Sequence, residues 1–550
     1  MPEFLLLLIG LGPFLYSGLT LETDNLRQFF FALSLIVCLS GGIPRSTHPN
    51  ATNRLSLWDI LIILFLIIRI LTAKWGTEYF WYSLPTLINE CLLGITYFLI
   101  RIHPPKARDL VFMSLGLLIS ITLVNLGQYI KPEFFKPVLQ GRYSAQFFHP
   151  NLQGIYACAC LCILWDFKPK TRGIFTLALV LTIISVYLCQ SRTAFLGLTL
   201  VLIGYSSNKV RAGLVLLLPL ILGLWFYNSG DMMEKFRMNF SIAFEIKWSV
   251  YESTGAAIKA NPLGLGTGLF PERINAYLSD SFHYWLPNPA QNSLHNAHNS
   301  ILHYVCESGW IMLTCIFLAG YLILQKFREN GSFVLILFVL TALFDVHLQQ
   351  FTSQLFFILL LAIYQDKPLN LNLLSTFQTF LLPLILILCI SAPLILHQQI
   401  YARFLKSALV SSKSINDLQT YREILNFNPW PLPSLKVEYL KLGSLIEEGS
   451  YNHALDLGMR LNQLFPGYYL LEHMIGRLYL LKGKPESALI WAEKAIDLHP
   501  MEEDNYLLLS EAYSALDESK KASDALELYL KLAHRNKNFR DQHINSEKTD

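Results

Sequence analysis

Apolar segments of near membrane-spanning length are the feature that most restricts the fold of this 550-residue chain. About 13 such runs occur in the first 400 residues, and a helix of about 20 apolar residues crosses the hydrocarbon core of a bilayer. The chain is 53% hydrophobic and only 15% charged, which excludes an ordinary soluble protein. Because backbone polar groups must be satisfied within the bilayer, we predict an all-α, polytopic membrane helix bundle of about 12 to 13 spans. The runs are 4–19, 28–43, 55–71, 79–100, 110–130, 152–167, 173–189, 194–206, 212–228, 299–325, 332–347, 353–364 and 376–396.

Positive charge between the runs predicts their orientation. If the N-terminus is cytoplasmic, the cytoplasmic connections hold most of the Lys and Arg residues, as the positive-inside rule requires. An odd number of spans then puts the long connection 228–297 and everything after residue 397 on the outer side. The cysteines fall inside apolar runs, so we expect no disulfide framework and no cysteine metal site.

The stretch 294–321 joins a polar, histidine-bearing loop to a membrane-length apolar run, and it is the predicted mouth of an active site. If a helix starts near Asn299, then His298, Leu302, Val305 and Gly309 lie along one face. A glycine there lets another helix approach closely. Histidine side chains titrate near neutral pH, so His298 suits proton transfer. The alternative is an interfacial histidine that is hydrogen-bonded to a neighbouring loop.

Basic residues on the predicted outer side depart from the charge rule. Lys131, Lys136 and Arg142 follow the fifth run, and Arg192 lies between the seventh and eighth. Guanidinium groups near the outer ends of helices are suitable ligands for an anion. The alternative for each is a lipid-headgroup or helix-end contact.

The long connection 228–297 carries its own aromatic residues, so we expect it to fold as helices on the membrane face. Its glycine-rich stretch 261–270 lacks the preceding strand and following GK[ST] of a nucleotide-binding loop. Tight turns at the rim of the site are the better interpretation.

After residue 397 the composition changes and a repeat appears. Gly449 and Gly483, and Pro466 and Pro500, each recur at a 34-residue spacing. This period is typical of tetratricopeptide repeats. We therefore predict a transmembrane domain at 1–398, a helical repeat solenoid at 399–535 and a polar tail at 536–550. The repeats either cap the membrane domain or bind a protein.

Four motifs together resemble the O-antigen ligase superfamily, which includes O-antigen ligases, O-linked oligosaccharyltransferases and O-antigen polymerases. His298-Asn299, nine residues and Gly309 look like its H-[NSQ]-x9-G signature. The other three matching segments are Gly141-Arg142 with His149-Pro150-Asn151, Gln190-Ser191-Arg192, and Asn261-Pro262 with Gly264 and Gly266. The resemblance covers about residues 1 to 395.

The resemblance implies a GT-C-like enzyme of the bacterial inner membrane, with the long connection and the repeats in the periplasm. The implied reaction is a metal-independent, inverting transfer of a glycan from an undecaprenyl-pyrophosphate carrier to a hydroxyl acceptor, either lipid A-core or protein Ser/Thr. His298 would be the general base, and Arg142, Arg192 and Arg273 would bind the donor pyrophosphate. Further site candidates are His149, Asn151, Gln190, Asn299 and His295. No cofactor and no nucleic acid are implied, and the partners are the donor, the acceptor, membrane lipid and a protein bound by the repeats.

Three alternatives stay open at this point. A polymerase of the same superfamily would use another lipid-linked glycan as acceptor. A transporter or flippase would show polar residues along the bilayer midplane, whereas Arg69, Glu90 and Glu307 look scattered in the sequence. A membrane-anchored repeat scaffold would not need about 13 spans. Among the acids, Glu245, Glu252 and Asp345 are possible partners of His298 or of sugar hydroxyls.

Overall fold

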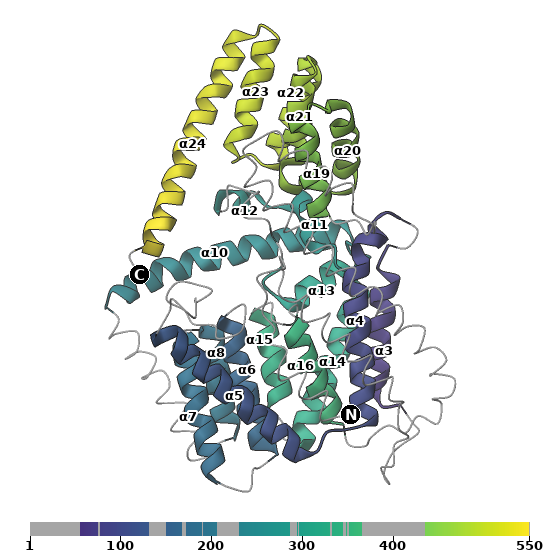
Figure 1. Ribbon diagram of the computed structural model, residues 1–550, viewed down its shortest axis with the longest axis vertical. Coiled ribbons are helices and arrows are strands. Elements are labelled where there is room, and N and C mark those ends of the chain that lie inside the picture. Colours follow the sequence, from purple (N-terminus) through teal and green to yellow (C-terminus); the bar gives the residue numbers. More distant parts are fainter. Residues whose placement is uncertain are drawn as a thin grey trace.

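A computed structural model describes residues 55–74, 77–130, 150–167, 172–189, 191–205, 230–285, 294, 296–330, 333–344, 348, 351–365 and 435–548. Within these residues every regular element is a helix (Figure 1). The all-α prediction is confirmed for this part of the chain. The predicted runs at 4–19, 28–43, 212–228 and 376–396 lie outside it.

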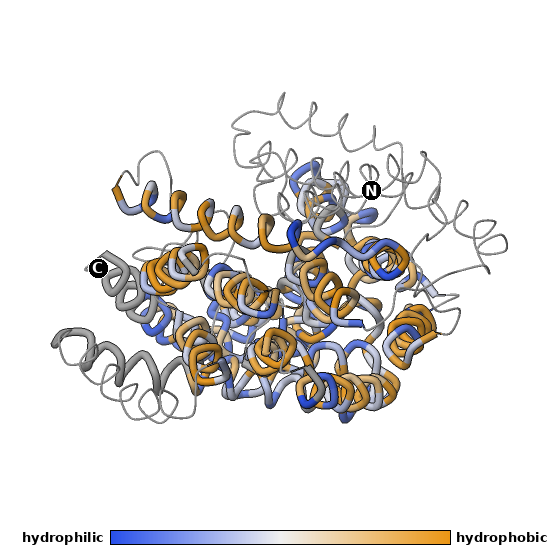
Figure 2. The backbone as a smooth tube through the Cα atoms, turned by 90° about the horizontal axis from the view of Figure 1, so that it is seen from below, coloured by the Kyte–Doolittle hydropathy of each residue, from blue (hydrophilic) through white to orange (hydrophobic). Residues whose placement is uncertain are grey.

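The lower part of the molecule is a helix bundle. Its helices are α3 (Leu57–Leu71), α4 (Tyr79–Ile102), α5 (Ala107–Ile130), α6 (Pro150–Asp166), α7 (Arg172–Cys189), α8 (Arg192–Tyr205), α14 (Trp310–Asn330), α15 (Val334–Phe344) and α16 (Phe351–Ile363). Seen from below, most of them are strongly hydrophobic along their length (Figure 2). Among the described residues, Tyr79–Ile102, Ala107–Ile130 and Trp310–Arg328 are long and apolar enough to cross a membrane. The chain is therefore a membrane protein.

Helix α6 is the centre of the bundle. Every residue from Leu152 to Leu164 is buried, and the helix packs against α5, α7, α8 and α15. A helix that is apolar on all sides requires neighbours on all sides. The sequence therefore places α6 inside the bundle.

One side chain joins the lower ends of α3 and α4. Asp59 completes a capping box with Ser56 at the start of α3. Its Oδ1 also accepts hydrogen bonds from Tyr97 Oη at 2.8 Å and from Arg101 Nε at 3.0 Å on α4. The buried Asp59 carboxylate is thus paired with a charge and with hydrogen-bond donors, as a buried ion requires.

Residues 230–285 form a layer across one end of the bundle, which we call the roof. It consists of α10 (Gly230–Ala260), α11 (Phe270–Arg273), the 3-10 helix η2 (Ile274–Tyr277) and α12 (Asp280–Trp285), and α10 runs across the ends of the bundle helices (Figure 1). Below it, α13 (Ser300–Ser308) leads into α14. The roof has a core of its own around Val250, Phe270 and Phe282. The prediction that this connection folds as helices is confirmed for residues 230–285, and its position on a membrane surface stays a prediction.

The C-terminal residues form three helical hairpins: α19 (Leu435–Glu447) with α20 (Tyr451–Leu464), α21 (Leu471–Leu481) with α22 (Pro485–Leu498), and α23 (Glu503–Ala515) with α24 (Ser519–Lys548). The connection inside each hairpin has one residue with positive φ: Gly449 (73°), Gly483 (65°) and Asp517 (62°). These three positions are 34 residues apart, so the period recurs in the backbone. The assignment to tetratricopeptide repeats stays a prediction.

The expected boundary at residue 535 does not coincide with an end of structure. Helix α24 continues to Lys548. Asn536 is only 3% exposed, and its Nδ2 donates to Met501 O at 3.1 Å. This contact makes the start of the expected polar tail part of the last hairpin.

The C-terminal domain rests on α4 and on the roof. The Phe465 ring packs against Tyr79 and Tyr82, with ring centroids 5.6 and 4.9 Å apart. Tyr79 Oη donates to Leu464 O at 2.9 Å. On the other side of the junction, the rings of His283 and His499 lie 5.5 Å apart. The C-terminal hairpins therefore stand above α11 and α12 (Figure 1).

Candidate active site

The single long helix expected from Asn299 onward is two helices. The Asn299 side chain caps α13, because its Oδ1 accepts from Ile301 N at 2.9 Å and from Leu302 N at 3.1 Å. Helix α13 ends at Gly309, whose φ is 75°, and α14 starts at Trp310. The expected face from His298 to Gly309 is wrong, since both residues lie outside the helix. Asn299 acts here as a helix cap.

His298 occupies a backbone conformation that is uncommon for a residue with a side chain. Its φ is 48°, in the left-handed region that costs an L-residue about 1 to 2 kcal/mol. Two hydrogen bonds hold it: His298 N donates to Asn296 Oδ1 at 3.1 Å, and Tyr251 Oη of α10 donates to His298 O at 3.4 Å. The half-buried histidine is thus positioned between the roof and the start of α13.

Two motif glycines meet at the end of α13. Leu265 N donates to Cys306 O at 2.9 Å, and Trp310 N donates to Pro262 O at 3.1 Å. A Cβ on Gly264 would lie 2.2 Å from Glu307 O, and one on Gly309 would lie 2.4 Å from Pro262 O. The expectation that Gly309 admits another helix is wrong. It admits the loop 262–263, and the two motifs build one backbone contact.

Three charged residues that look scattered in the sequence form one buried network. Arg69 of α3 donates through Nε to both carboxylate oxygens of Glu90 on α4, at 2.8 and 2.9 Å. Its Nη2 lies 2.7 Å from Glu307 Oε2 on α13, and its Nη1 donates to Ser308 Oγ at 2.9 Å. All three charged side chains are at most 3% exposed. Isolated charges inside apolar segments are the sequence signal for this network, because an unpaired buried charge is very costly.

The network also reaches the roof. Glu307 Oε1 lies 3.3 Å from His303 Nε2 and accepts from Phe270 N at 3.3 Å. Thr267 Oγ1 donates to Arg69 O at 2.7 Å. Glu307 therefore joins α3, α13 and the roof at one point. Its backbone carbonyl accepts from Gly266 N at 2.9 Å, in the connection 261–269 between α10 and α11, which we call the motif loop.

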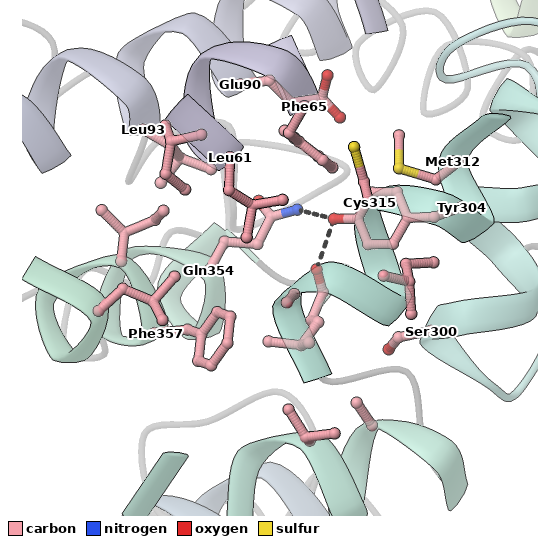
Figure 3. A pocket seen from close by; sticks show the side chains of 18 of the residues that line it. Leu61, Phe65, Glu90, Leu93, Ser300, Tyr304, Met312, Cys315, Gln354 and Phe357 are labelled. Atoms are coloured by element: carbon pink, nitrogen blue, oxygen red, sulfur yellow. Dashed lines mark hydrogen bonds between the residues drawn. The ribbon is translucent and has the colours of Figure 1, made fainter. Parts of the chain in front are cut away.

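A cavity of about 200 Å³ lies between α3, α4, α13, α14, α15 and α16. Its walls are almost entirely apolar, with Leu61, Phe65, Leu93, Met312 and Phe357 among them (Figure 3). Its polar lining residues are Glu90, Ser300, Tyr304 and Gln354.

The polar lining groups are held by their own hydrogen bonds. Gln354 Nε2 donates to Tyr304 Oη at 2.9 Å, and Tyr304 Oη donates to Leu348 O at 3.1 Å (Figure 3). Ser300 is the first residue of α13 and follows His298 by two positions. The cavity suits an apolar chain, and its polar groups include the start of the helix that follows His298.

Arg273 lies at the junction of the roof and α4. Its Nη1 donates to Leu265 O, and its guanidinium carbon is 4.8 Å from the centre of the Tyr79 ring. Arg273 is thus linked to α13 through Leu265, whose N–H donates to Cys306 O. Helix α8 begins at Arg192, whose side chain lies outside the described residues, as do Arg142, His149, Gln190 and His295. Asn151 is half-buried in the first turn of α6.

The acids expected beside His298 lie elsewhere. Glu245 and Glu252 are exposed on α10, and Asp345 is outside the described residues. Within the described residues, Glu307 is part of α13, and Glu90 of α4 joins it through Arg69. Within the described ranges, no group of three or more His, Cys, Asp or Glu side chains is arranged to hold a metal ion.

The fold and the site define a polytopic helical membrane protein with a roofed, largely apolar cavity. A family model described as O-Antigen ligase matches residues 177–317. The match includes the roof, His298, α13 and the first turns of α14, and it supports a membrane glycosyltransferase of the O-antigen ligase or polymerase type. No curated protein matches the chain.

Proposed function

We propose that the protein transfers a glycan from an undecaprenyl-pyrophosphate carrier to a hydroxyl acceptor at the roof side of the membrane, the periplasmic side of a bacterial inner membrane. The observation that carries the proposal is the apolar cavity, whose polar lining includes the start of α13. A polyprenyl chain needs an apolar site within the bundle, and its reacting head group needs titratable and hydrogen-bonding groups at one end. His298 lies two residues before that helix.

The chemistry is a single displacement at the anomeric carbon. The acceptor oxygen attacks C1 while the bond from C1 to the pyrophosphate oxygen breaks, and His298 takes the acceptor proton. Attack from the face opposite the leaving group inverts the configuration at C1. Arg142 and Arg192, with Arg273 from the roof, stabilise the charge that develops on the pyrophosphate, so the reaction needs no metal ion.

The C-terminal hairpins support a protein as acceptor or partner over lipid A-core, because helical repeats bind polypeptides on their concave face. A polymerase is the second candidate, since the family match supports ligase and polymerase alike. A transporter is disfavoured by the Arg69 network, whose charges are paired with one another and almost fully buried. Charges on a transport path would instead line a water-filled cavity.

The test is a transfer assay with purified full-length protein in nanodiscs, undecaprenyl-pyrophosphate-linked glycan and EDTA. Candidate acceptors are a Ser/Thr-containing protein, lipid A-core and a second lipid-linked glycan. His298→Ala should abolish transfer, while His453→Ala, at an exposed histidine of α20, should leave it unchanged. Product on protein or lipid A-core identifies a transferase, and a ladder on the carrier identifies a polymerase. Full activity of His298→Ala would remove the histidine as base, and transfer that requires a divalent ion would refute the metal-independent mechanism.

A further inference from the structure

Lys74 lies in the connection between α3 and α4, and the sequence motifs do not include it. It is half-buried and has φ of 57°. Its side-chain stem passes over the motif loop: a Cβ on Gly266 would lie 3.1 Å from Lys74 Cγ. The absence of a side chain at Gly266 therefore leaves the space that the lysine stem occupies.

Arg273 reaches the same segment of the loop. It donates to the carbonyl of Leu265, the residue before Gly266. Burial lowers the pKa of Lys74, and the positive charge of Arg273 lowers it further. Two cations thus converge on residues 265 and 266.

These two cations differ from the buried arginines in having no counterion among the residues that the structure describes. Arg69 is paired with Glu90 and Glu307, and Arg101 with Asp59. Among the described residues, neither Lys74 nor Arg273 forms an ion pair, and the Lys74 ammonium has no hydrogen-bond acceptor. Two like charges held together in a half-buried position repel each other unless an anion lies between them.

The position of the pair indicates which class of anion it is suited to bind. Lys74 lies five residues before the candidate span Tyr79–Ile102, on the roof side of the bundle. Cations at the end of a span lie at the level of lipid headgroups. A phosphate accepts several hydrogen bonds at once and binds both ammonium and guanidinium groups.

We propose that Lys74 and Arg273 form a binding site for the phosphate oxyanions of a lipid headgroup at the roof side of the membrane. The choice of undecaprenyl pyrophosphate as the first probe rests on the proposed function. The site itself does not depend on glycosyl transfer. Arg273 also holds the roof through Leu265 and Tyr79, so Lys74 is the residue whose removal tests the site most directly.

The experiment measures lipid binding to the full-length protein by native mass spectrometry and by fluorescence titration. The probes are undecaprenyl pyrophosphate, undecaprenol as the phosphate-free chain, phosphatidylglycerol and inorganic pyrophosphate. Lys74→Gln should weaken the binding of undecaprenyl pyrophosphate about tenfold, the effect of losing one charge-assisted contact. Its affinity for undecaprenol should be unchanged. Lys74→Arg should retain most of the binding, and Lys259→Gln, at an exposed lysine of α10, should bind as the wild type does.

The probes also separate the sources of phosphate. A Lys74-dependent preference for undecaprenyl pyrophosphate identifies the glycan carrier as the ligand, and a Lys74-dependent preference for phosphatidylglycerol identifies bulk membrane lipid. A Lys74-dependent preference for inorganic pyrophosphate identifies a soluble anion and overturns the headgroup assignment. Equal binding of every phosphate probe to Lys74→Gln and the wild type overturns the site. If Lys74→Gln weakens the binding of undecaprenol as much as that of undecaprenyl pyrophosphate, the site is also overturned. The lysine would then affect binding of the apolar chain rather than of the phosphate.

Two further measurements keep the test independent of folding and of transfer. Without lipid, Lys74→Gln should unfold at the same temperature as the wild type or higher, because it removes repulsion from Arg273; a lower temperature would indicate a structural lysine. In a His298→Ala background the Lys74 effect on binding should persist. Loss of transfer with intact phosphate binding would then bear on the proposed function alone.

Discussion

Two cations near the end of α3 lie in opposite environments. Arg69 is enclosed by Glu90, Glu307 and Ser308. Lys74, five residues later, is half-buried beside another cation and forms no ion pair within the described residues. A fully paired buried charge stabilises the arrangement of helices, whereas an uncompensated pair of cations is available to a ligand. The contrast distinguishes structural charge from charge that binds, and the following experiments test it in order of expected effect.

Removing the buried charge of Arg69 should have the largest effect on stability. Arg69→Met leaves two buried carboxylates without their cation, and breaking a buried ion pair costs about 3 to 5 kcal/mol. We expect a large fall in thermal stability in detergent. Arg460→Met is the matched control, because Arg460 and Glu438 form an exposed pair worth at most about 1 kcal/mol. Equal losses in the two variants would contradict the comparison.

Substitutions at the backbone contact between the motif loop and the end of α13 should have the second-largest effect on stability. Gly264→Ala and Gly309→Ala each place a methyl group within 2.4 Å of a backbone oxygen, and we expect each to destabilise the protein by about 2 to 3 kcal/mol. Transfer activity should fall as well, because the same contact positions the helix that follows His298. Gly255→Ala is the control, since its Cβ would meet nothing within 4 Å. Stability is measured by thermal unfolding. If both glycine variants were as stable as the wild type, the motif loop would not be packed against the end of α13.

The junction with the C-terminal domain should respond to acid. Burial and the neighbouring His499 lower the pKa of His283 to about 4, although Asp280 opposes this. Burial also lowers the pKa of His499, against the Gly467 carbonyl and Glu472. Both histidines therefore take up a proton less readily in the folded protein than in the unfolded chain, which is protonated at these positions below about pH 6.5. Stability should therefore fall as the pH drops from about 6.5 to about 4, by about 2 kcal/mol.

The measurement is the unfolding free energy at pH 7 and pH 4.5. His283→Gln should flatten the dependence, and His453→Gln, at an exposed position, should leave it as in the wild type. If the profile of His283→Gln matches that of the wild type, the buried histidine pair is not the origin of the acid sensitivity.

Removing the charge of Lys74 should have the smallest effect on stability, and the effect should be stabilising or absent. Lys74→Gln should leave stability unchanged or raise it by at most about 1 kcal/mol, as expected for a partly exposed charge. Thermal unfolding of the lipid-free protein measures it beside Arg69→Met. Destabilisation of Lys74→Gln by as much as Arg69→Met would erase the difference between the two cations.

Several parts of the site were accessible from the sequence, and the reason differs from residue to residue. Gly264 and Gly309 were found as motif positions because a motif is a local pattern. Their shared role was not found, since it depends on two backbones meeting across about 45 residues. The face from His298 to Gly309 was assigned wrongly because ideal helical spacing assumes an unbroken helix, and φ of 75° at Gly309 ends it.

The sequence by itself determined the helical class, the membrane bundle and the 34-residue period, because hydrophobic length and periodicity are properties of neighbouring residues. Only the tertiary structure decided which charges are paired. Arg69, Glu90 and Glu307 are far apart in the chain and meet because three helices pack there. It also decided that Lys74 and Arg273 lie close together without a counterion from the described part of the chain. The physical reason is that the energy of a charge depends on its distance to other charges and to water, and packing sets both.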